Sequence, residues 1–171
     1  MHIRKQWKMK ICSLVLCLTL LVTGLAYTPT ARAEEQKTGT EIIVDNDNTG
    51  FTKSGTWNTS TYRAGYYGKN YFSASTTGAT ATWTPTIETA GYYNVYVWHS
   101  VVTGDGTIAN NALYEIRHVD GSSSVRKSMR NAGGGWELIA CERFAAGTDG
   151  AVKLTLDEDS GGAVMADAVR F

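Results

Sequence analysis

The chain is 171 residues long, with 16 Lys and Arg, 16 Asp and Glu, and a formal net charge of zero. Five of the basic residues precede Glu34 whereas every acidic residue follows Ala33, which leaves 11 basic against 16 acidic residues, a net charge of −5, in the rest of the chain. Because that part has no cluster of Lys and Arg large enough to replace phosphate counterions, the sequence excludes nucleic acid as a partner.

The first predicted element, residues 1–33, is typical of a secretory signal peptide. A basic start is followed by an apolar stretch from Ile11 to Ala26 and by the small-residue sequence Ala31-Arg32-Ala33, which has the layout of a cleavage site. An uncleaved membrane anchor and a lipoprotein signal are alternatives. However, the apolar stretch is short for a membrane span, and Cys17 follows Leu16 where a lipid-attachment site has a small residue. The sequence predicts a secreted, extracellular protein with no membrane contact after cleavage.

The next segment, residues 34–41, is polar and is expected to be a flexible N-terminal lead-in. The remainder, residues 42–171, shows no long linker and no internal repeat. Its length is sufficient for one domain with a buried core. We therefore predict a single domain over residues 42–171.

Short β-type segments alternate with Gly, Asn, Asp and Ser turns throughout this domain. No stretch keeps an apolar period near 3.6 residues for long enough to indicate a helix. Such spacing predicts an all-β fold, a β-sandwich. The predicted strands are Ile42–Asp45, Tyr71–Ser73, Ala79–Thr84, Gly91–Ser100, Ala112–His118, Ser123–Met129, Trp136–Phe144, Ala151–Leu156 and Val164–Phe171.

Alternation along the fourth of these strands assigns its two faces. Because side chains of a strand point to opposite faces in turn, Tyr93, Val95 and Val97 are expected to point into the core. By the same argument Val169 and Phe171 close the core at the end of the chain. The outward row of the fourth strand consists of Tyr92, Asn94, Tyr96 and Trp98.

Seven ordered motifs give the domain a family resemblance. They are Ile43-Val44-Asp45-Asn46, Gly55-Thr56-Trp57, Ala81-Thr82-Trp83-Thr84-Pro85, Gly91-Tyr92-Tyr93-Asn94-Val95-Tyr96-Val97-Trp98, Tyr114-Glu115-Ile116-Arg117-His118, Gly134-Gly135-Trp136 and Ala166-Asp167-Ala168-Val169-Arg170-Phe171. In this order they resemble the golvesin C-terminal-like domain, which is also found appended to xanthan lyases and some cell-wall amidases. The same progression looks like the jelly-roll carbohydrate-binding modules. The resemblance implies a single jelly-roll β-sandwich that binds an extracellular polymer.

Aromatic side chains provide the candidate binding site. A sugar ring has an apolar face and a rim of hydroxyl groups, so its site needs flat aromatic surface and a few polar groups. The alternative is that these aromatics belong to the core, or that a long loop over residues 48–70 covers the outward row. The candidate carbohydrate-binding residues are Trp57, Tyr66, Tyr67, Tyr92, Tyr96, Trp98 and Trp136.

The case for catalysis is weaker. His99 has Ser100 beside it, but neighbours on a strand point to opposite faces, so the two are poor partners. No Gly-x-Ser-x-Gly elbow is present, and the consecutive acids at residues 157–159 are typical of a solvated turn. We therefore predict no catalytic residues, and a small polysaccharide hydrolase or lyase is the least favoured function.

A structural calcium is the one cofactor considered. Carboxylate and amide oxygens are the ligands that calcium prefers, and Asp45-Asn46-Asp47-Asn48 supplies several, although without EF-hand spacing. The resemblance to carbohydrate-binding jelly rolls, which often hold calcium between their first and last strands, implies Asp45 and Asp167 as ligands, with Glu41 nearby. The alternative is that Asp45 forms a turn and Asp167 accepts hydrogen bonds.

Together these patterns predict a secreted, non-catalytic module that binds an extracellular or cell-envelope polysaccharide. A structural or protein-interaction module of an extracellular matrix is the alternative, in which the aromatics are core and edge strands or loops contact a protein.

Overall fold

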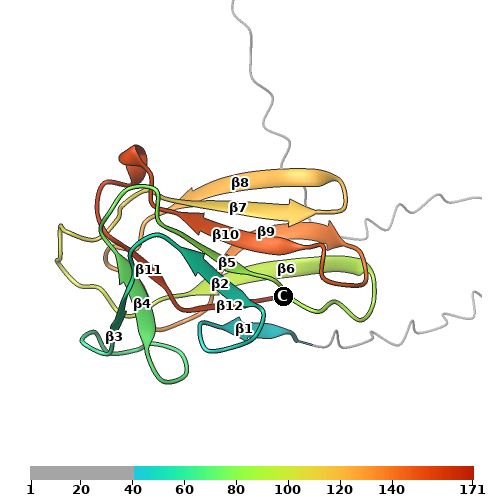
Figure 1. Cartoon of the computed structure of the whole chain (residues 1–171), viewed down its shortest axis with the longest axis horizontal. Coiled ribbons are helices and arrows are strands. Elements are labelled where there is room, and N and C mark those ends of the chain that lie inside the picture. The colour runs from blue at the N-terminus through green and yellow to red at the C-terminus, as the bar shows by residue number, and fades with distance from the viewer. Residues whose placement is uncertain (1–40) are drawn as a thin grey trace, which may run out of the picture. The chain divides into compact units, whose positions relative to one another are not determined.

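The computed structural model describes residues 41–171 (Figure 1). These residues contain twelve strands and one 3₁₀ turn, joined by loops. The predicted signal peptide and all but the last residue of the predicted lead-in lie outside these residues. Within residues 41–171 no helix has the length and apolar character needed to cross a bilayer.

Three antiparallel sheets arise from these strands, with the orders β1-β12-β6-β9, β2-β5-β10-β7-β8 and β11-β4-β3. The 3₁₀ turn η1 covers Glu158–Ser160. The strands are β1 Ile43–Asp45, β2 Phe51–Ser54, β3 Asn58–Ser60, β4 Tyr71–Ala74, β5 Thr80–Trp83, β6 Gly91–Trp98, β7 Ala112–His118, β8 Gly121–Lys127, β9 Glu137–Phe144, β10 Ala151–Thr155, β11 Val164–Ala166 and β12 Ala168–Arg170.

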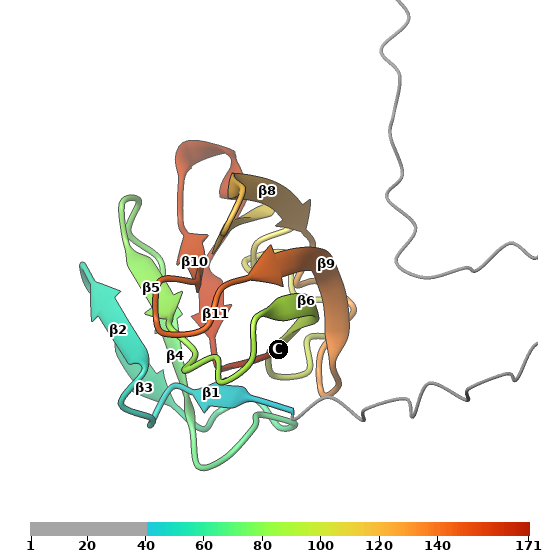
Figure 2. The same cartoon turned by 90° about the vertical axis from the view of Figure 1, so that its right-hand side faces the viewer.

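The four-stranded and five-stranded sheets form the two layers of a sandwich (Figure 2). Val95, Val97 and Val169 of the first layer and Trp83 and Leu154 of the second are all buried in one hydrophobic core. Removing such apolar surface from water is the main stabilising contribution to a domain of this size. The predicted all-β sandwich is confirmed.

The two faces of β6 follow the predicted alternation. Val95 and Val97 are buried and Tyr93 packs partly against the core, whereas Tyr92 and Asn94 are exposed. Tyr96 and Trp98, on the same outward side, are half-buried. The outward row therefore lies on the outer face of the four-stranded sheet.

Two sequence predictions about the elements are wrong. The predicted strands omit β2 and β3, which divide the region from Asn48 to Asn70. Only the loop between β3 and β4 packs on the outward row, where Tyr67 contacts Trp98. The predicted last strand, Val164–Phe171, is divided at Asp167 into β11, which pairs with β4, and β12, which pairs with β1 and β6. At Asp167 the chain thus passes from one sheet to another.

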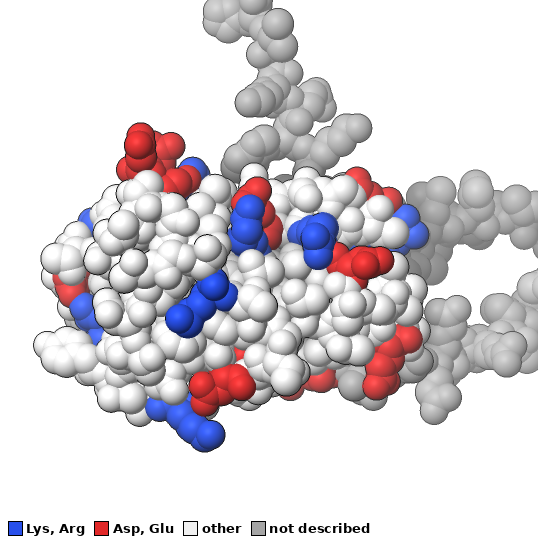
Figure 3. Space-filling view, viewed as in Figure 1, with Lys and Arg blue, Asp and Glu red and all other residues white. Residues whose placement is uncertain are grey.

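Charged side chains are dispersed over the outer face of the five-stranded sheet. In Figure 3 basic and acidic groups are interspersed, and neither sign gathers into a continuous patch. Cross-strand ion pairs explain part of this pattern, since Lys153 of β10 forms an ion pair with Glu115 of β7. The face in view therefore has no strong field of one sign.

Candidate functional site

A row of paired residues crosses the outer face of the four-stranded sheet. Ile43 of β1 lies opposite Arg170 of β12, Arg170 opposite Tyr96 of β6, and Tyr96 opposite Leu138 of β9. The Arg170 guanidinium lies 4.1 Å from the centroid of the Tyr96 ring, and its Nη1 is 2.8 Å from Glu41 Oε1. Arg170 is therefore held between an aromatic face and a carboxylate.

Three aromatic rings pack together beside this row. Trp98 and Trp136 have ring centroids 5.2 Å apart, and Tyr67 lies 5.7 Å from Trp98 and 5.4 Å from Trp136. Their planes meet at 52–73°, so the rings contact one another edge to face and form a wall rather than one flat platform. The Trp98 indole donates to the Gly65 carbonyl at 2.7 Å, which fixes its orientation.

At the other end of β6, Tyr92 extends the aromatic surface into solvent. Its side chain is 69% exposed and lies opposite Arg143 of β9. Four residues along a strand place it roughly 13 Å from Tyr96, with exposed Asn94 between them. We call this area, made of Tyr92, Asn94, Tyr96, Trp98, Tyr67, Trp136 and Arg170, the β6 surface.

Two predicted residues lie apart from the β6 surface. Trp57 is only 9% exposed, and its indole donates to the Ser54 carbonyl at 2.9 Å, as expected of a core residue. Tyr66 is half-buried against the core, with its ring 6.3 Å from that of Tyr71. The structure thus brings together Tyr67, Tyr92, Tyr96, Trp98 and Trp136, but not these two.

Two accessible side chains are absent from the candidate carbohydrate-binding residues. Arg170 was not among the candidates, although alternation with inward Val169 predicts an outward side chain. Its place beside Tyr96 follows from the pairing of β12 with β6. Tyr62, in the loop between β3 and β4, is 88% exposed. The neighbouring Arg63 forms an ion pair with Asp105, which ties this loop to the segment after β6.

The two predicted calcium ligands meet beneath the loop that contains Tyr67. Asp167 is fully buried, and both of its carboxylate oxygens accept from the Tyr67 backbone N–H, at 3.2 and 3.1 Å. Asp45 is also buried and lies against Gly68, where an added Cβ would be only 2.2 Å from Asp45 Oδ2. Residues 67 and 68 therefore rest on both carboxyl groups.

Burial controls the protonation of this acidic pair. It raises the pKa of Asp167 to about 8, against the lowering effect of the Tyr67 N–H, and the charge of Asp45 raises it further. Burial also raises the pKa of Asp45, while the hydrogen bond from the Asn46 backbone N–H opposes this change. At neutral pH Asp167 is therefore mostly protonated.

The donor set for calcium is incomplete. Asp45 and Asp167 supply two carboxylates, whereas calcium takes six to eight oxygen ligands. Glu41 is paired with Arg170, and residues 41–171 contain no group of three or more His, Cys, Asp or Glu side chains arranged to hold a metal. The structural calcium stays a prediction.

The histidines are separated from one another. His99 is buried at the end of β6 with Nδ1 2.9 Å from the Ser100 carbonyl oxygen, and burial lowers its pKa. His118 lies on β7 of the other sheet, 3.8 Å from Glu142. The two histidines thus lie on different sheets, and His99 contacts the backbone carbonyl of Ser100 rather than its hydroxyl.

This fold is a jelly-roll β-sandwich, the class of fold also seen in carbohydrate-binding modules. The fold resembles a family 35 carbohydrate-binding module from an environmental isolate, with a TM-score of 0.53 and 19% identity over 74% of this chain and 89% of that one. It also resembles the family 35 module of Abf62 from Cellvibrio japonicus, with a TM-score of 0.55 and 17% identity. That match covers 77% of this chain and 92% of the module. At these identities the likeness establishes the fold, and the predicted jelly roll is confirmed.

The chain belongs to the Golvesin C-terminal domain family, whose model matches residues 42–171. It is 33% identical over 137 residues to a xanthan lyase from Bacillus sp. (strain GL1). The matched region is 76% of this chain and 14% of the lyase. The structure of a Paenibacillus xanthan lyase matches with a TM-score of 0.71 and 33% identity over 76% of this chain and 12% of that one. The chain thus corresponds to a small segment of these lyases, and the family resemblance is confirmed.

Proposed function

We propose that this protein is a secreted, non-catalytic module that binds an extracellular or cell-envelope polysaccharide through the β6 surface. The fold is shared with carbohydrate-binding modules and with a segment of xanthan lyases, which supports a carbohydrate ligand. The observation that most supports this surface is the exposed ring of Tyr92, on the same face as Tyr96 and the aromatic wall.

Binding at this surface combines stacking with hydrogen bonds. The apolar face of a sugar unit packs on the Tyr92 ring, and the edges of Tyr96 and Trp98 contact further units along the strand. The Asn94 amide and the Arg170 guanidinium donate hydrogen bonds to sugar hydroxyls. Because the wall of Tyr67, Trp98 and Trp136 is already packed, little side-chain entropy is lost on binding.

A retention assay on immobilised polysaccharides tests this proposal. Purified protein is applied to a panel that includes peptidoglycan, xanthan and neutral glucans, in chelator and in calcium. We expect retention on at least one polysaccharide and a loss of about tenfold in affinity for Tyr92→Ala or Tyr96→Ala. This loss is at the lower end of the roughly 1–3 kcal/mol that a nucleic-acid base gains by stacking on an aromatic ring. The matched control is Tyr62→Ala, which removes an exposed tyrosine outside the β6 surface.

An extracellular matrix module that contacts a protein is the second candidate. It is favoured by Leu138, which is 49% exposed and extends the β6 surface with aliphatic area. Absence of retention on every polysaccharide would overturn the carbohydrate proposal in favour of this one. Equal losses for Tyr62→Ala and Tyr92→Ala would overturn the assignment to the β6 surface.

A further inference from the structure

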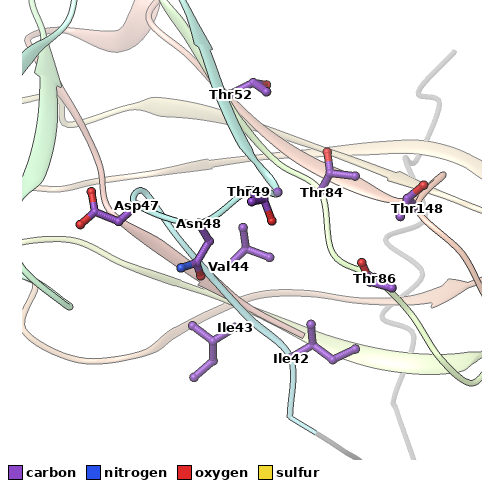
Figure 4. Close-up of a pocket in the computed structure, with 11 residues that line it drawn as sticks. Ile42, Ile43, Val44, Asp47, Asn48, Thr49, Thr52, Thr84, Thr86 and Thr148 are labelled. Carbon is purple, nitrogen blue, oxygen red and sulfur yellow. The ribbon is translucent and has the colours of Figure 1, made fainter.

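A groove runs along the edge of the sandwich where β1 and β2 lie. These are the end strands of the four-stranded and five-stranded sheets. The groove has a volume of about 680 Å³, within the range of roughly 300–1,000 Å³ usual for small-molecule sites (Figure 4). It is lined by β1, the turn to β2, β2 itself, the segment after β5 and the loop before β10. None of the lining residues is one of the seven residues of the β6 surface, although Ile43 lies opposite Arg170.

Threonine dominates the lining of this groove. Among the described residues, none of the hydroxyls of the five lining threonines takes part in a hydrogen bond within the protein. Each therefore presents both a free hydroxyl, which donates and accepts, and a γ-methyl group. In Figure 4 Ile42 and Ile43 lie on the side away from Thr52, and Val44 lies next to Thr49. The five threonines are Thr49, Thr52, Thr84, Thr86 and Thr148.

The backbone of β1 adds a further donor and acceptor. Ile42 and Phe171 exchange both of their N–H to carbonyl hydrogen bonds, at 3.0 and 2.8 Å. In an antiparallel ladder the next residue then directs its N–H and C=O away from the partner strand. The N–H and C=O of Ile43 consequently face the sandwich edge, where the groove lies.

Gly50 holds the two sides of the groove close together. The Thr84 N–H donates to its carbonyl at 2.8 Å, and an added Cβ would lie 2.4 Å from Thr84 O and 3.2 Å from Val44 Cγ1. Only a residue without a side chain fits this approach. The groove is thus fixed by the β1 to β2 turn itself.

The charge of the lining indicates which ligand fits. Asp47 is the one charged residue among the lining side chains, and no aromatic ring is among them. Asp47 is itself paired with Lys69, at 3.9 Å between Oδ2 and Nζ. Because no Lys or Arg is among the lining residues, an anion finds no cationic partner in the groove, whereas hydroxyls, methyl groups and backbone amides match a neutral, hydroxyl-rich chain. We propose that this groove is a second carbohydrate-binding site, which takes a neutral oligosaccharide segment. This inference relies on the proposed function for the class of ligand and on the groove alone for the location.

An NMR titration tests the groove separately from the β6 surface. Cellohexaose, xylohexaose and mannohexaose are the neutral probes, and a galacturonate hexamer is the anionic one. We expect a neutral probe to shift the backbone amides of Thr49, Gly50 and Thr148, which line the groove away from Arg170, with saturation. The triple variant Thr84→Val, Thr86→Val, Thr148→Val, which keeps side-chain shape, should weaken these shifts by about tenfold. Thr59→Val on β3 is the control.

The indole N–H signals of Trp98 and Trp136 separate the two proposals. Shifts of the indoles alone would overturn the groove and leave the proposed function standing, whereas no shift anywhere would overturn both. Groove shifts that persist in the triple variant would overturn the assignment of binding to the threonines. Equal groove shifts with the galacturonate hexamer would overturn the assignment of a neutral ligand.

Discussion

The buried carboxyl group of Asp167 makes stability depend on pH. Its pKa is about 8 in the folded protein and near 4 in an unfolded chain, so both states bind the proton below pH 4. As the pH rises from 4 to 8 the unfolded state ionises first, and the free energy of unfolding decreases. Asp167→Asn, neutral at every pH, should remove this decrease while still accepting the Tyr67 N–H.

Thermal melts between pH 5 and 9 in chelator measure this effect. We expect the Tm of the parent to fall by at least about 3 °C more than that of Asp167→Asn over this range. Asp159→Asn, which changes an exposed carboxylate, serves as the control. Identical slopes for the parent and Asp167→Asn would contradict the raised pKa.

The predicted structural calcium has a separate test at the same pair. A cation bound by Asp45 and Asp167 favours their ionised forms and binds only the folded state, so calcium should raise the Tm at pH 8. The increase should be absent in Asp167→Asn and should not be reproduced by magnesium. If calcium leaves the Tm of the parent unchanged, the two carboxyl groups have hydrogen-bonding roles alone.

Gly68 and Gly78 form a matched pair for the contact above Asp45. Both have positive φ, 63° and 90°, but an added Cβ contacts Asp45 at Gly68 and nothing within 4 Å at Gly78. Gly68→Ala should therefore reduce the free energy of unfolding by about 1–3 kcal/mol more than Gly78→Ala, as overpacking does. Urea denaturation of the two variants checks this difference, and equal losses would place Gly68 outside any tight contact.

At the scale of elements, Tyr67 fixes the loop between β3 and β4 on the four-stranded sheet. Its ring packs on Trp98 and Trp136, and its N–H donates to Asp167. Tyr67→Ala should increase hydrogen exchange at residues 65–68 by about tenfold or more without changing exchange at Val95 and Val97. Tyr62→Ala, at the exposed part of the same loop, should change neither. Unchanged exchange at residues 65–68 in Tyr67→Ala would show that the aromatic wall does not hold the loop.

The strands with a clear hydrophobic pattern could be predicted from the sequence, and those without one could not. The alternation in β6 and the β-branched and aromatic residues of β7 identify those strands and their faces. β2 and β3, Phe51–Ser54 and Asn58–Ser60, are short and mostly polar, and they are positioned by pairing with β5 and β4. Nothing local in such a sequence distinguishes an edge strand from a loop.

The candidate site was predictable only where it follows one strand. The outward row of β6 came from its period of two, but the approach of Tyr67, Gly68 and Asp45 to Asp167 depends on contacts between distant segments. The break at Asp167 has the same cause, because strand pairing and not local pattern makes β11 and β12 belong to different sheets. The edge groove was missed since threonines at surface positions give no signal of convergence.

For the whole molecule, the balance of charge predicts weak dependence of binding on salt. Arg170 is paired with Glu41 and Arg143 with Asp120, so the cations beside the β6 surface are already neutralised. Raising the salt concentration from about 50 to 500 mM should change the Kd for a neutral polysaccharide by less than about threefold, because screening acts on unpaired charge. Affinity electrophoresis at several salt concentrations measures this. A steep decrease in affinity would indicate ionic recognition instead.

The position of β12 between β1 and β6 has a consequence for folding. Ile43, near the beginning of the domain, must pair with Arg170, so the contact order of the four-stranded sheet is high. While the chain is being synthesised, β1 and β6 lack the strand that joins them until β12 has left the ribosome. The nascent domain therefore cannot complete its first layer early, and a polypeptide destined for export as proposed would remain in an unfolded, translocation-competent state for longer.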